Sequence, residues 1–443
     1  MATGLSKTKW NGNLGIVDHM PANGMSGVSL SYAGKQAEAD ILDASPAQIA
    51  TCWNPASPAT NPIVNRLYLG DNLPILALLK TDPTIQGRVR LVYIDPPFST
   101  KGVFQSRSQI DAYQDLLTGS QYIEFMRQRL IFLRELLAAD GSIYVHLDEN
   151  MVFYIKIIMD EVFGRQNFRN IITRKKCNPK NYTRRTYGNV SDYILFYTKT
   201  DDYVWNRPHV AWTSDSILKE YSYTEANTGR LYKKVPIHAP GTRNGETGKP
   251  WRGMSPPPGK HWQFPPTTLD EMDARGEIYW SPNGNPRRKV YLDGSQGIPV
   301  QDIWLECRDA HNQMIRVTGY PTEKNPELIK RIVAASSNEG DMVLDCFSGS
   351  GTTLSVASSL GRNWIGVDDS TEAIATTLRR FANGLNRMGD FVSSKEAAEE
   401  QSAFSLPGES AVTDFSINSV ASRHDELNAI IAQWKKDIDR FDA

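Results

Sequence analysis

The chain is poor in cysteine and has no long apolar segment, and each shortage excludes a class of protein. Its 443 residues include four cysteines, which lie far apart and form no CxxC pair: Cys52, Cys177, Cys307 and Cys346. This usage predicts reduced, packed thiols and argues against a disulfide framework or a metal site. No apolar run approaches the roughly 18 residues that a membrane helix needs, and the N-terminus lacks the apolar core of a signal peptide. We therefore expect a cytoplasmic protein that does not enter a membrane.

A strong net charge is also missing. The formal charge is −1, which alone argues against a simple nucleic-acid-binding module. The distribution is uneven, because residues 170–320 hold 22 Lys and Arg against 15 Asp and Glu. Salt confines an electrostatic field to about 8–10 Å, so a local basic excess is enough to attract a polyanion. From the sequence alone, an unevenly charged solvated surface explains the excess equally well.

What the chain does contain is an alternation of strand and helix patterns. Strand candidates at residues 66–69, 89–94 and 142–147 are separated by helical patterns, and further strands are expected at 342–344 and 364–367. The longest helix, expected to be capped by Ser120, carries apolar residues at spacings of three and four. This alternation predicts an α/β fold with a doubly wound sheet.

The alternation lapses over residues 201–320, which hold 12 of the 25 prolines and 6 of the 10 tryptophans. We therefore predict a loop-rich, mostly β region inserted between two parts of the α/β core. The expected segments are a weakly ordered extension (1–64), the first part of the core (65–200), the insertion (201–320), the second part of the core (321–390), and a polar tail with a final helix (391–443).

The first motif with chemical meaning is Asp95-Pro96-Pro97-Phe98, directly after a predicted strand. The amino group of a nucleobase is a poor nucleophile, because its lone pair is delocalised into the ring. A carboxylate and a backbone carbonyl at one strand end can accept both amino hydrogens and favour the pyramidal geometry that attacks. The prolines stiffen the turn, and the aromatic ring offers a flipped base a stacking surface. A strand that merely ends in a Pro-Pro turn is the simpler alternative.

The second motif is the glycine turn from Phe347 to Thr352, which follows a predicted strand and precedes a helix. Its glycines let the backbone approach a ligand, and the helix N-terminus offers unpaired N–H groups. Asp368, at the end of the next strand, suits a carboxylate that accepts ribose hydroxyls. No Gly-Lys-Ser/Thr follows, so a phosphate-binding P-loop is disfavoured. Asp71 at the first strand's end fits a cofactor contact or a plain helix N-cap, and Lys324 fits a cofactor contact or a surface lysine.

Together these segments resemble a known family, the β-class amino-methyltransferases of DNA. The similar segments are residues 70–72, 95–98, 141–148, 320–332 and 343–353. In that class the base-binding motif precedes the target-recognition region, and the S-adenosylmethionine motif comes last. The resemblance implies a circularly permuted Rossmann-like sheet, with residues 201–320 recognising DNA. The chain otherwise resembles the modification subunits of type III restriction systems, but it is shorter than those subunits.

The resemblance also assigns roles to individual residues. Asp95, Pro96, Pro97 and Phe98 would hold the target base. The residues that would contact S-adenosylmethionine are Asp71, Lys324, Asp345, Phe347, Gly349, Gly351, Thr352 and Asp368. One departure is visible: the family usually has Lys-Pro where this chain has Lys324-Asn325, with proline at 326. Asparagine is a competent N-cap, so we expect the helix start to survive.

The first position of the base motif favours adenine N6 as the methyl acceptor, because relatives acting on cytosine N4 more often carry serine there. Cytosine N4 therefore stays open as an alternative, and the motifs do not distinguish RNA from DNA. Cytosine C5 chemistry needs a Pro-Cys pair, which this sequence lacks. An inactive DNA-binding scaffold of a restriction complex is a further alternative, but it would predict damaged motifs, and both motifs are intact.

We expect duplex DNA as the partner, and two basic clusters as its phosphate contacts. The first comprises Arg174, Lys175, Lys176, Lys180, Arg184 and Arg185; the second lies in the insertion and contains Arg287 and Arg288. Solvated charge runs are the alternative for both clusters. Because Pro-Asp, which opens the common nuclease motif, is absent, any restriction activity would belong to a partner subunit on another chain. A homodimer also stays open.

Overall fold

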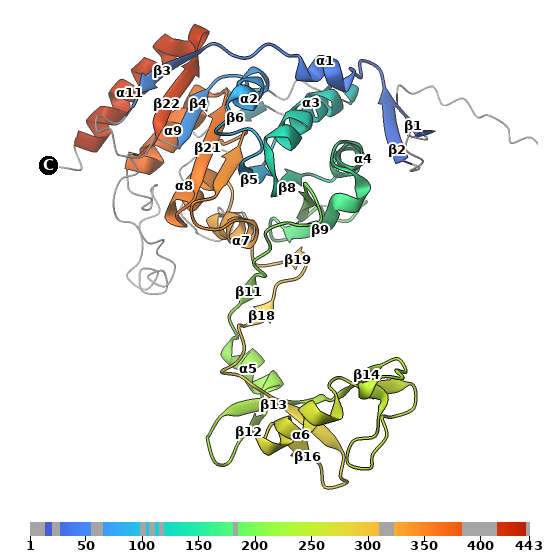
Figure 1. Ribbon diagram of the computed structural model, residues 1–443. Helices are drawn as coiled ribbons and strands as arrows, with labels where there is room; N and C mark the ends of the chain where they lie inside the picture. Colours follow the sequence, from blue (N-terminus) through green and yellow to red (C-terminus); the bar gives the residue numbers. More distant parts are fainter. Residues whose placement is uncertain are drawn as a thin grey trace, which may run out of the picture. The chain divides into compact units, whose positions relative to one another are not determined.

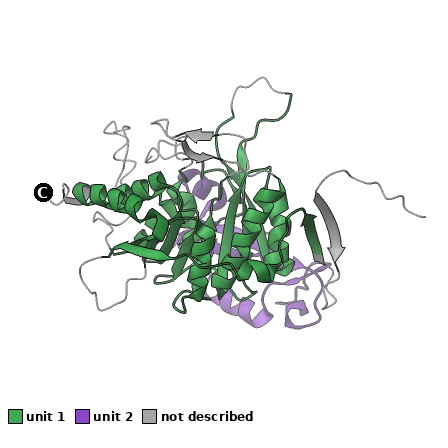
Figure 2. Cartoon of the chain, turned by 90° about the horizontal axis from the view of Figure 1, so that it is seen from above, with its two compact units in different colours: residues 1–206, 301–443 green, residues 207–300 purple. Residues whose placement is uncertain are grey.

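A ten-stranded mixed sheet forms the core of the first of two compact units, residues 1–206 and 301–443 (Figure 1; Figure 2). In this computed structural model the described residues are 14–19, 27–54, 65–97, 103–105, 111–114, 119–179, 185–309, 323–382 and 414–439. The strand order is β19-β9-β10-β8-β5-β20-β21-β4-β22-β3. The six strands from β8 to β22 are parallel to one another, whereas β10 and β3 pair antiparallel with β8 and β22.

The strands of this sheet are short, apart from β8. Their bounds are β3 (Ile49–Trp53), β4 (Arg66–Leu69), β5 (Val89–Ile94), β8 (Leu137–Leu147), β9 (Phe168–Lys175), β10 (Ser191–Thr198), β19 (Ile303–Trp304), β20 (Met342–Asp345), β21 (Asn363–Asp368) and β22 (Ser416–Val420). Smaller hairpins are formed by β1 (Leu14–His19) with β2 (Gly27–Tyr32), and by β6 (Val103–Gln105) with β7 (Asp111–Gln114).

Helices cover both faces of the sheet. They are α1 (Glu38–Leu42), α2 (Asn72–Thr81), α3 (Ser120–Leu136), α4 (Val152–Phe163), α7 (Pro326–Ser336), α8 (Thr352–Ser359), α9 (Thr371–Ala382) and α11 (His424–Asp439). In β8, Ile143 and Val145 join the apolar core that contains α2, α3 and α4. Tyr144, on the opposite face, hydrogen bonds to Ser336 of α7. Alternate residues thus face different helical layers, as expected for a doubly wound sheet. In the described part of the chain, no helix is both long and apolar enough to cross a membrane.

The second unit, residues 207–300, is built mostly from short antiparallel strands (Figure 2). Its sheet has the order β12 (Tyr223–Thr224), β13 (Leu231–Pro236), β17 (Pro286–Tyr291) and β16 (Ile278–Trp280). Two further pairs are β11 (His209–Val210) with β18 (Ile298–Pro299) and β14 (His238–Pro240) with β15 (Lys260–Trp262). Its helices are α5 (Ser214–Glu220) and α6 (Pro266–Ala274). Trp251 and Trp262 lie in the core of this unit, which falls inside the interval 201–320 expected for the insertion.

The two ends of the chain depart from the prediction. Residues 27–54, expected to be weakly ordered, place Leu30, Tyr32 and Ile41 in the core, and β3 forms one edge of the large sheet. The tail is also part of the core, because β22 lies between β4 and β3. Residues 27–54 are therefore ordered parts of the core instead of a weakly ordered extension, and the tail contributes a strand as well as the expected final helix.

Two helix starts were predicted from capping residues, with different outcomes. Asn325 is the N-cap of α7, and its side-chain oxygen accepts a hydrogen bond from the Glu327 N–H at 2.9 Å, which confirms that prediction. The predicted cap by Ser120 is wrong, since Gly119 occupies the N-cap position of α3 and makes no side-chain cap. Gly119 has a φ of 58°, a left-handed conformation that glycine adopts readily.

The integration of the tail makes a prediction about stability. Phe415 is fully buried just before β22, and its ring centroid lies 5.2–5.7 Å from those of Trp53, Trp364, Phe381 and Trp434. We expect Phe415→Ala to lower the free energy of unfolding by about 3–5 kcal/mol, because it leaves a cavity among these rings. Urea unfolding measures the change. Tyr187→Ala, at a fully exposed position, is the control and should shift stability by no more than about 0.5 kcal/mol. Equal effects of both substitutions would contradict a structured tail.

Candidate active site

The two motifs meet because their strands are neighbours. β5 and β20 pair in parallel, and so do β20 with β21 and β21 with β4, so their carboxyl ends lie along one edge of the sheet. Asp95 follows β5, Asp345 ends β20, Asp368 ends β21 and Asp71 follows β4. Ligands of open α/β sheets bind at the carboxyl ends of the strands. Segments about 250 residues apart in the sequence therefore form one candidate site.

Asp95 is held by an ion pair. Lys324 Nζ lies 2.6 Å from Asp95 Oδ2, and the two side chains are only 11% and 18% exposed. The other oxygen, Asp95 Oδ1, is buried and has no hydrogen-bond partner within the described residues. Burying an unpaired acceptor costs free energy, so this atom is an acceptor positioned for a donor. Pro96 and Pro97 continue the turn, whereas Phe98 lies outside the described residues.

The glycine turn is built by backbone hydrogen bonds to the two neighbouring aspartates. The Phe347 N–H donates to Asp345 Oδ1 at 3.0 Å, and the Gly349 N–H donates to Asp368 Oδ2 at 2.8 Å. Gly349 and Gly351 have φ angles of 50° and 74°, in the left-handed region. A Cβ on Gly351 would lie 2.7 Å from the Thr377 side chain, so no larger residue fits there without a shift. Thr352 then begins α8.

Burial perturbs the acidity of both aspartates. The pKa of Asp345 is raised to about 7, mainly by burial and also by the nearby carboxylates of Asp95 and Asp368, against hydrogen bonds from Thr353 and Phe347. Burial also raises the pKa of Asp368 to about 6, although the N–H groups of Ser370 and Gly349 favour the charged form. Perturbed carboxyls at the edge of a sheet are typical of functional sites.

Asp71 both caps helix α2 and accepts a hydrogen bond from a buried arginine, Arg129. It caps α2 by accepting the Leu73 N–H at 3.0 Å, and Arg129 Nη2 donates to the same oxygen at 3.0 Å. Arg129 also donates to Asn72 Oδ1, and Asn72 donates to the Cys346 carbonyl at 2.7 Å. The N-terminal end of α2 is thus tied to the strand that carries the glycine turn. Arg129 was not predicted as a site residue, because a buried arginine cannot be distinguished from a surface one in a helical pattern.

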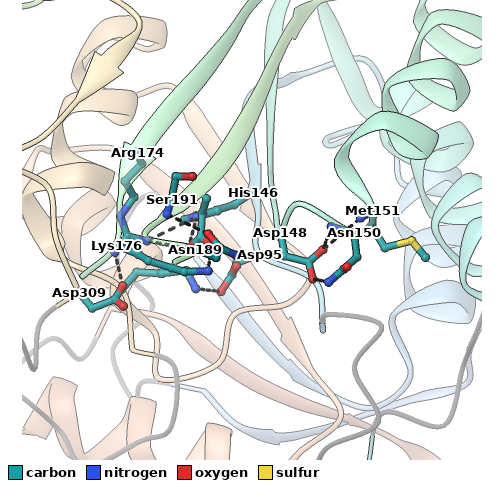
Figure 3. A network of polar contacts seen from close by, with 12 residues as sticks. Asp95, His146, Asp148, Asn150, Met151, Arg174, Lys176, Asn189, Ser191 and Asp309 are labelled. Atoms are coloured by element: carbon teal, nitrogen blue, oxygen red, sulfur yellow. Dashed lines mark hydrogen bonds and ion pairs between the residues drawn. The ribbon is translucent and has the colours of Figure 1, made fainter. Parts of the chain in front are cut away.

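A polar network lies on the strands next to Asp95 (Figure 3). His146 is fully buried in β8; its Nδ1 lies 2.9 Å from the Tyr93 hydroxyl and its Nε2 lies 3.5 Å from Asp192 Oδ2. Asp192 also accepts a hydrogen bond from Lys176 at 2.9 Å. Hydrogen bonding and charge from His146, and the charges of Lys176 and Lys324, hold the pKa of Asp192 well below its usual value, against the effect of burial. The network therefore joins β5, β8, β9 and β10 beside the site.

This network corrects part of the predicted phosphate-binding cluster. Arg174 is fully buried; it donates to the Cys307 carbonyl at 2.6 Å and is ion-paired with Asp192 and Asp309. Because its guanidinium is not exposed to solvent, it cannot contact a phosphate, and its assignment as a DNA contact is wrong for this structure. Lys175 is half-buried and Arg185 is exposed, whereas Lys180 and Arg184 lie outside the described residues. In the second unit Arg287 is exposed, and Arg288 is half-buried with its guanidinium 5.4 Å from the Phe264 ring centroid.

The described residues show no metal-type cluster. No group of three or more His, Cys, Asp or Glu among them is arranged to hold a metal ion. All four cysteines are free thiols, and three of them are buried. The site combines carboxylates, Lys324 and backbone N–H groups with the side chains of Asn72 and Arg129.

The raised pKa of Asp345 predicts a pH dependence of stability. Its folded pKa of about 7 exceeds the unfolded value, so the folded state binds more protons, and stability present below pH ~4 is lost as the pH rises toward 7. By this shift the loss is up to about 4 kcal/mol. We expect Asp345→Asn to remove most of this decline, measured by urea unfolding between pH 4 and pH 7. Asp202→Asn, at an exposed position, should leave it in place. An unchanged pH dependence in Asp345→Asn would show that this carboxyl is ionised in the folded protein.

Comparison with known proteins agrees with this geometry. The N6/N4 family model described as DNA methylase matches residues 89–379. The type II methyltransferase M.EcaI of Enterobacter cloacae is 44% identical over 440 residues, covering 98% of this chain and 96% of that protein. The StyLTI Mod subunit of a type III restriction-modification enzyme from Salmonella typhimurium is 27% identical over 68% of this chain. That match covers 51% of the subunit, so the chain spans about half the length of this relative.

Among solved structures, the M1.HpyAVI–SAM complex has a TM-score of 0.40 and 16% identity, covering 71% of this chain and 98% of that chain. The family model spans the base motif and the glycine turn, and the likeness to M.EcaI extends over nearly the whole sequence. The chain therefore belongs to the N6/N4 DNA methylase family: it is a DNA methyltransferase that uses S-adenosylmethionine.

Proposed function

We propose that the chain methylates N6 of adenine at specific sites in duplex DNA, by direct attack of a flipped base on the methyl group of S-adenosylmethionine. The observation that carries this proposal is Asp95, which lies at the end of β5 beside the glycine turn of β20. One of its oxygens is held by Lys324, and the other is buried without a partner among the described residues.

In this proposal Asp95 Oδ1 accepts one hydrogen of the adenine amino group, and a backbone carbonyl of the Pro96-Pro97 turn accepts the other. Two acceptors favour the pyramidal nitrogen whose lone pair is available for attack. The base nitrogen forms a bond to the methyl carbon as the carbon–sulfur bond breaks, and it then releases a proton that Asp95 Oδ1 can accept. We assign Phe98 to stacking on the flipped base.

The residues of the glycine turn fit the cofactor. Left-handed glycines at 349 and 351 keep side chains away from the turn, and the N-terminus of α8 follows directly. Within the described residues, Ser348 Oγ is a buried polar atom in this turn with no hydrogen-bond partner. We propose that the cofactor is lined by Phe347, Gly349, Gly351 and Thr352, and that Asp368 accepts its ribose hydroxyls. Asp345 would hold the turn in place by accepting the hydrogen bond from the Phe347 N–H.

Lys324 and Asp71 fit more than one role. Because Lys324 is ion-paired with Asp95, we propose that it orients this carboxylate, in addition to any contact with the cofactor. Asp71 is more than half exposed in spite of its cap and its bond to Arg129, so it can still meet the amino acid end of the cofactor. Its role in holding the start of α2 is independent of that contact.

Two alternatives differ in the base or in the chemistry. Cytosine N4 carries an equivalent amino group, so the same acceptors could hold it, and only the aspartate at position 95 favours adenine. An inactive scaffold would have no need for a buried, ion-paired aspartate beside a glycine turn. The likeness to a Mod subunit supports a restriction-type partner on another chain as a further part of the proposal.

The role of Asp95 is testable by substitution. We expect Asp95→Ala to abolish methyl transfer while S-adenosylmethionine binding stays within a few-fold, because the carboxylate acts on the base. Loss of such an acceptor is worth ~3–4 kcal/mol, by analogy with removal of an oxyanion-hole donor. Labelled methyl retained on DNA measures transfer, and calorimetry measures cofactor binding. Near-normal turnover by a folded Asp95→Ala protein would remove Asp95 from the mechanism.

The glycine turn makes a separate prediction. Gly349→Ala should weaken S-adenosylmethionine binding roughly tenfold or more, ~1.4 kcal/mol, because a side chain there obstructs the approach of the ligand to the backbone. The matched control is Gly87→Ala, which also has a left-handed φ, of 66°, but lies before β5 with open space around a Cβ. Both variants share the backbone strain, and only the first should lose cofactor affinity in calorimetry. Equal affinities would show that Gly349 serves the fold alone.

A further inference from the structure

The sheet of the second unit has two faces of different character. In antiparallel pairs, residues directly opposite each other point to the same side. The register pairs Tyr232 with Tyr291, Lys234 with Lys289, Tyr223 with Tyr232 and Tyr279 with Arg287. One side of β12, β13, β17 and β16 therefore carries four tyrosines and three basic residues, and we call it the Tyr–Lys face: Tyr223, Tyr232, Tyr279, Tyr291, Lys234, Arg287 and Lys289.

The opposite side of the sheet packs against the core of the unit. Ile278 lies in the core with Trp251 and Trp262, and Trp280 packs against that core. Lys233, which also points to this side, is ion-paired with Glu220 at 3.3 Å. Core packing accounts for the opposite side, but it does not account for the composition of the Tyr–Lys face.

Lys234 is fixed on the Tyr–Lys face by two aromatic rings. Its Nζ lies 3.6 Å from the Tyr223 ring centroid and 3.5 Å from that of Tyr279. Cation–π attraction on both sides holds the ammonium without neutralising it. Within the described residues no carboxylate forms an ion pair with Lys234, whereas Lys289 on the same face is neutralised by Glu225 at 2.9 Å. The Lys234 ammonium is thus held in one orientation by the two rings.

A second cation without an ion pair lies beside it. Arg287 is exposed, opposite Pro236 in the register, and none of the described carboxylates lies within ion-pair distance of it. The adjoining hairpin contributes Lys260 and His238. Burial lowers the pKa of His238, and the positive charges of Lys260 and Arg287 lower it further. These three side chains therefore lie close enough to interact electrostatically. Lys260 and Arg287 thus place positive charge at this end of the Tyr–Lys face.

We propose that the Tyr–Lys face contacts the phosphate backbone of the DNA substrate, through Lys234 clamped between Tyr223 and Tyr279 and through Arg287. Lysine, arginine and tyrosine are the side chains that bind phosphate oxygens in protein–DNA complexes, and such contacts position the protein without reading the bases. This proposal rests on the proposed function. It adds a face that contacts the DNA backbone, distinct from the loops that would read the base sequence. It also divides the predicted basic cluster, since Arg287 belongs to this face and Arg288 to the opposite side.

The test compares two adjacent lysines on opposite faces. Binding of the full chain to a random-sequence DNA duplex is measured by fluorescence anisotropy between about 50 and 200 mM salt. Lys234→Gln should lower the slope of log affinity against log salt by about one, and should weaken binding about tenfold at low salt. Lys233→Gln should leave both unchanged, and Lys234→Arg should restore the slope. Identical slopes for the wild type, Lys234→Gln and Lys233→Gln would overturn the proposal, and so would equal losses in both glutamine variants.

A second pair guards against misfolding of the first variant. Arg287→Gln changes an exposed side chain and should also lower the slope by about one, whereas Arg275→Gln, which removes a residue paired with Glu277, should not. If Arg287→Gln binds DNA as the wild type does, the face contacts something other than DNA, such as an acidic protein surface.

Methyl transfer keeps this test distinct from that of the proposed function. At saturating DNA, Lys234→Gln should retain wild-type turnover, because Lys234 is not among the residues assigned to the target base or the cofactor. A wild-type chain that leaves no methyl group on DNA would refute the proposed function, while the salt slopes would still report on the Tyr–Lys face.

Discussion

The parallel pairing of β5 with β20 is the constraint on which the site depends. It aligns the end of the strand that carries Asp95 with the end of the strand that carries the glycine turn. The second unit lies between them in the sequence and contributes no strand to the large sheet. The chain order of the motifs is therefore unimportant for the chemistry, because the sheet brings them together from any order that preserves this pairing.

The charges at this edge follow from the same pairing. Asp345 and Asp368 end neighbouring strands, and burial raises the pKa of both. The carboxylates of Asp95 and Asp368 also raise the pKa of Asp345, and the carboxylate of Asp369 also raises that of Asp368. Asp95 forms an ion pair with Lys324, which lies just before α7. A buried carboxylate with one oxygen paired is well suited to accept a hydrogen bond, because it is already oriented and its charge is already balanced. The capping of α7 by Asn325 thus has a functional consequence, since it fixes the chain immediately after Lys324.

The fold class, the main strands and both motifs could be predicted from the sequence, because apolar periodicity and turn residues are local signals. The membership of β3 and β22 in the sheet could not, since their short runs include Ser416, Asn418 and Thr51, and their pairing joins segments more than 350 residues apart. Arg174 was misread for a related reason. A run of basic residues looks solvated, but in β9 Arg174 shares its side of the strand with buried Ile172, and the period of two would have placed it inward. The Lys324–Asp95 ion pair is a purely tertiary contact.

We propose that an adenine amino group is methylated at the edge where β5 and β20 end. The most direct measurement is the product itself. Duplex DNA is incubated with the wild-type chain and S-adenosylmethionine carrying an isotopically labelled methyl group, then digested to nucleosides and separated by mass. We expect the label to appear in N6-methyladenine, and to disappear when Asp95 is replaced by alanine. Label in N4-methylcytosine would contradict the assignment of the base, and label in no nucleoside would contradict the assignment of the reaction.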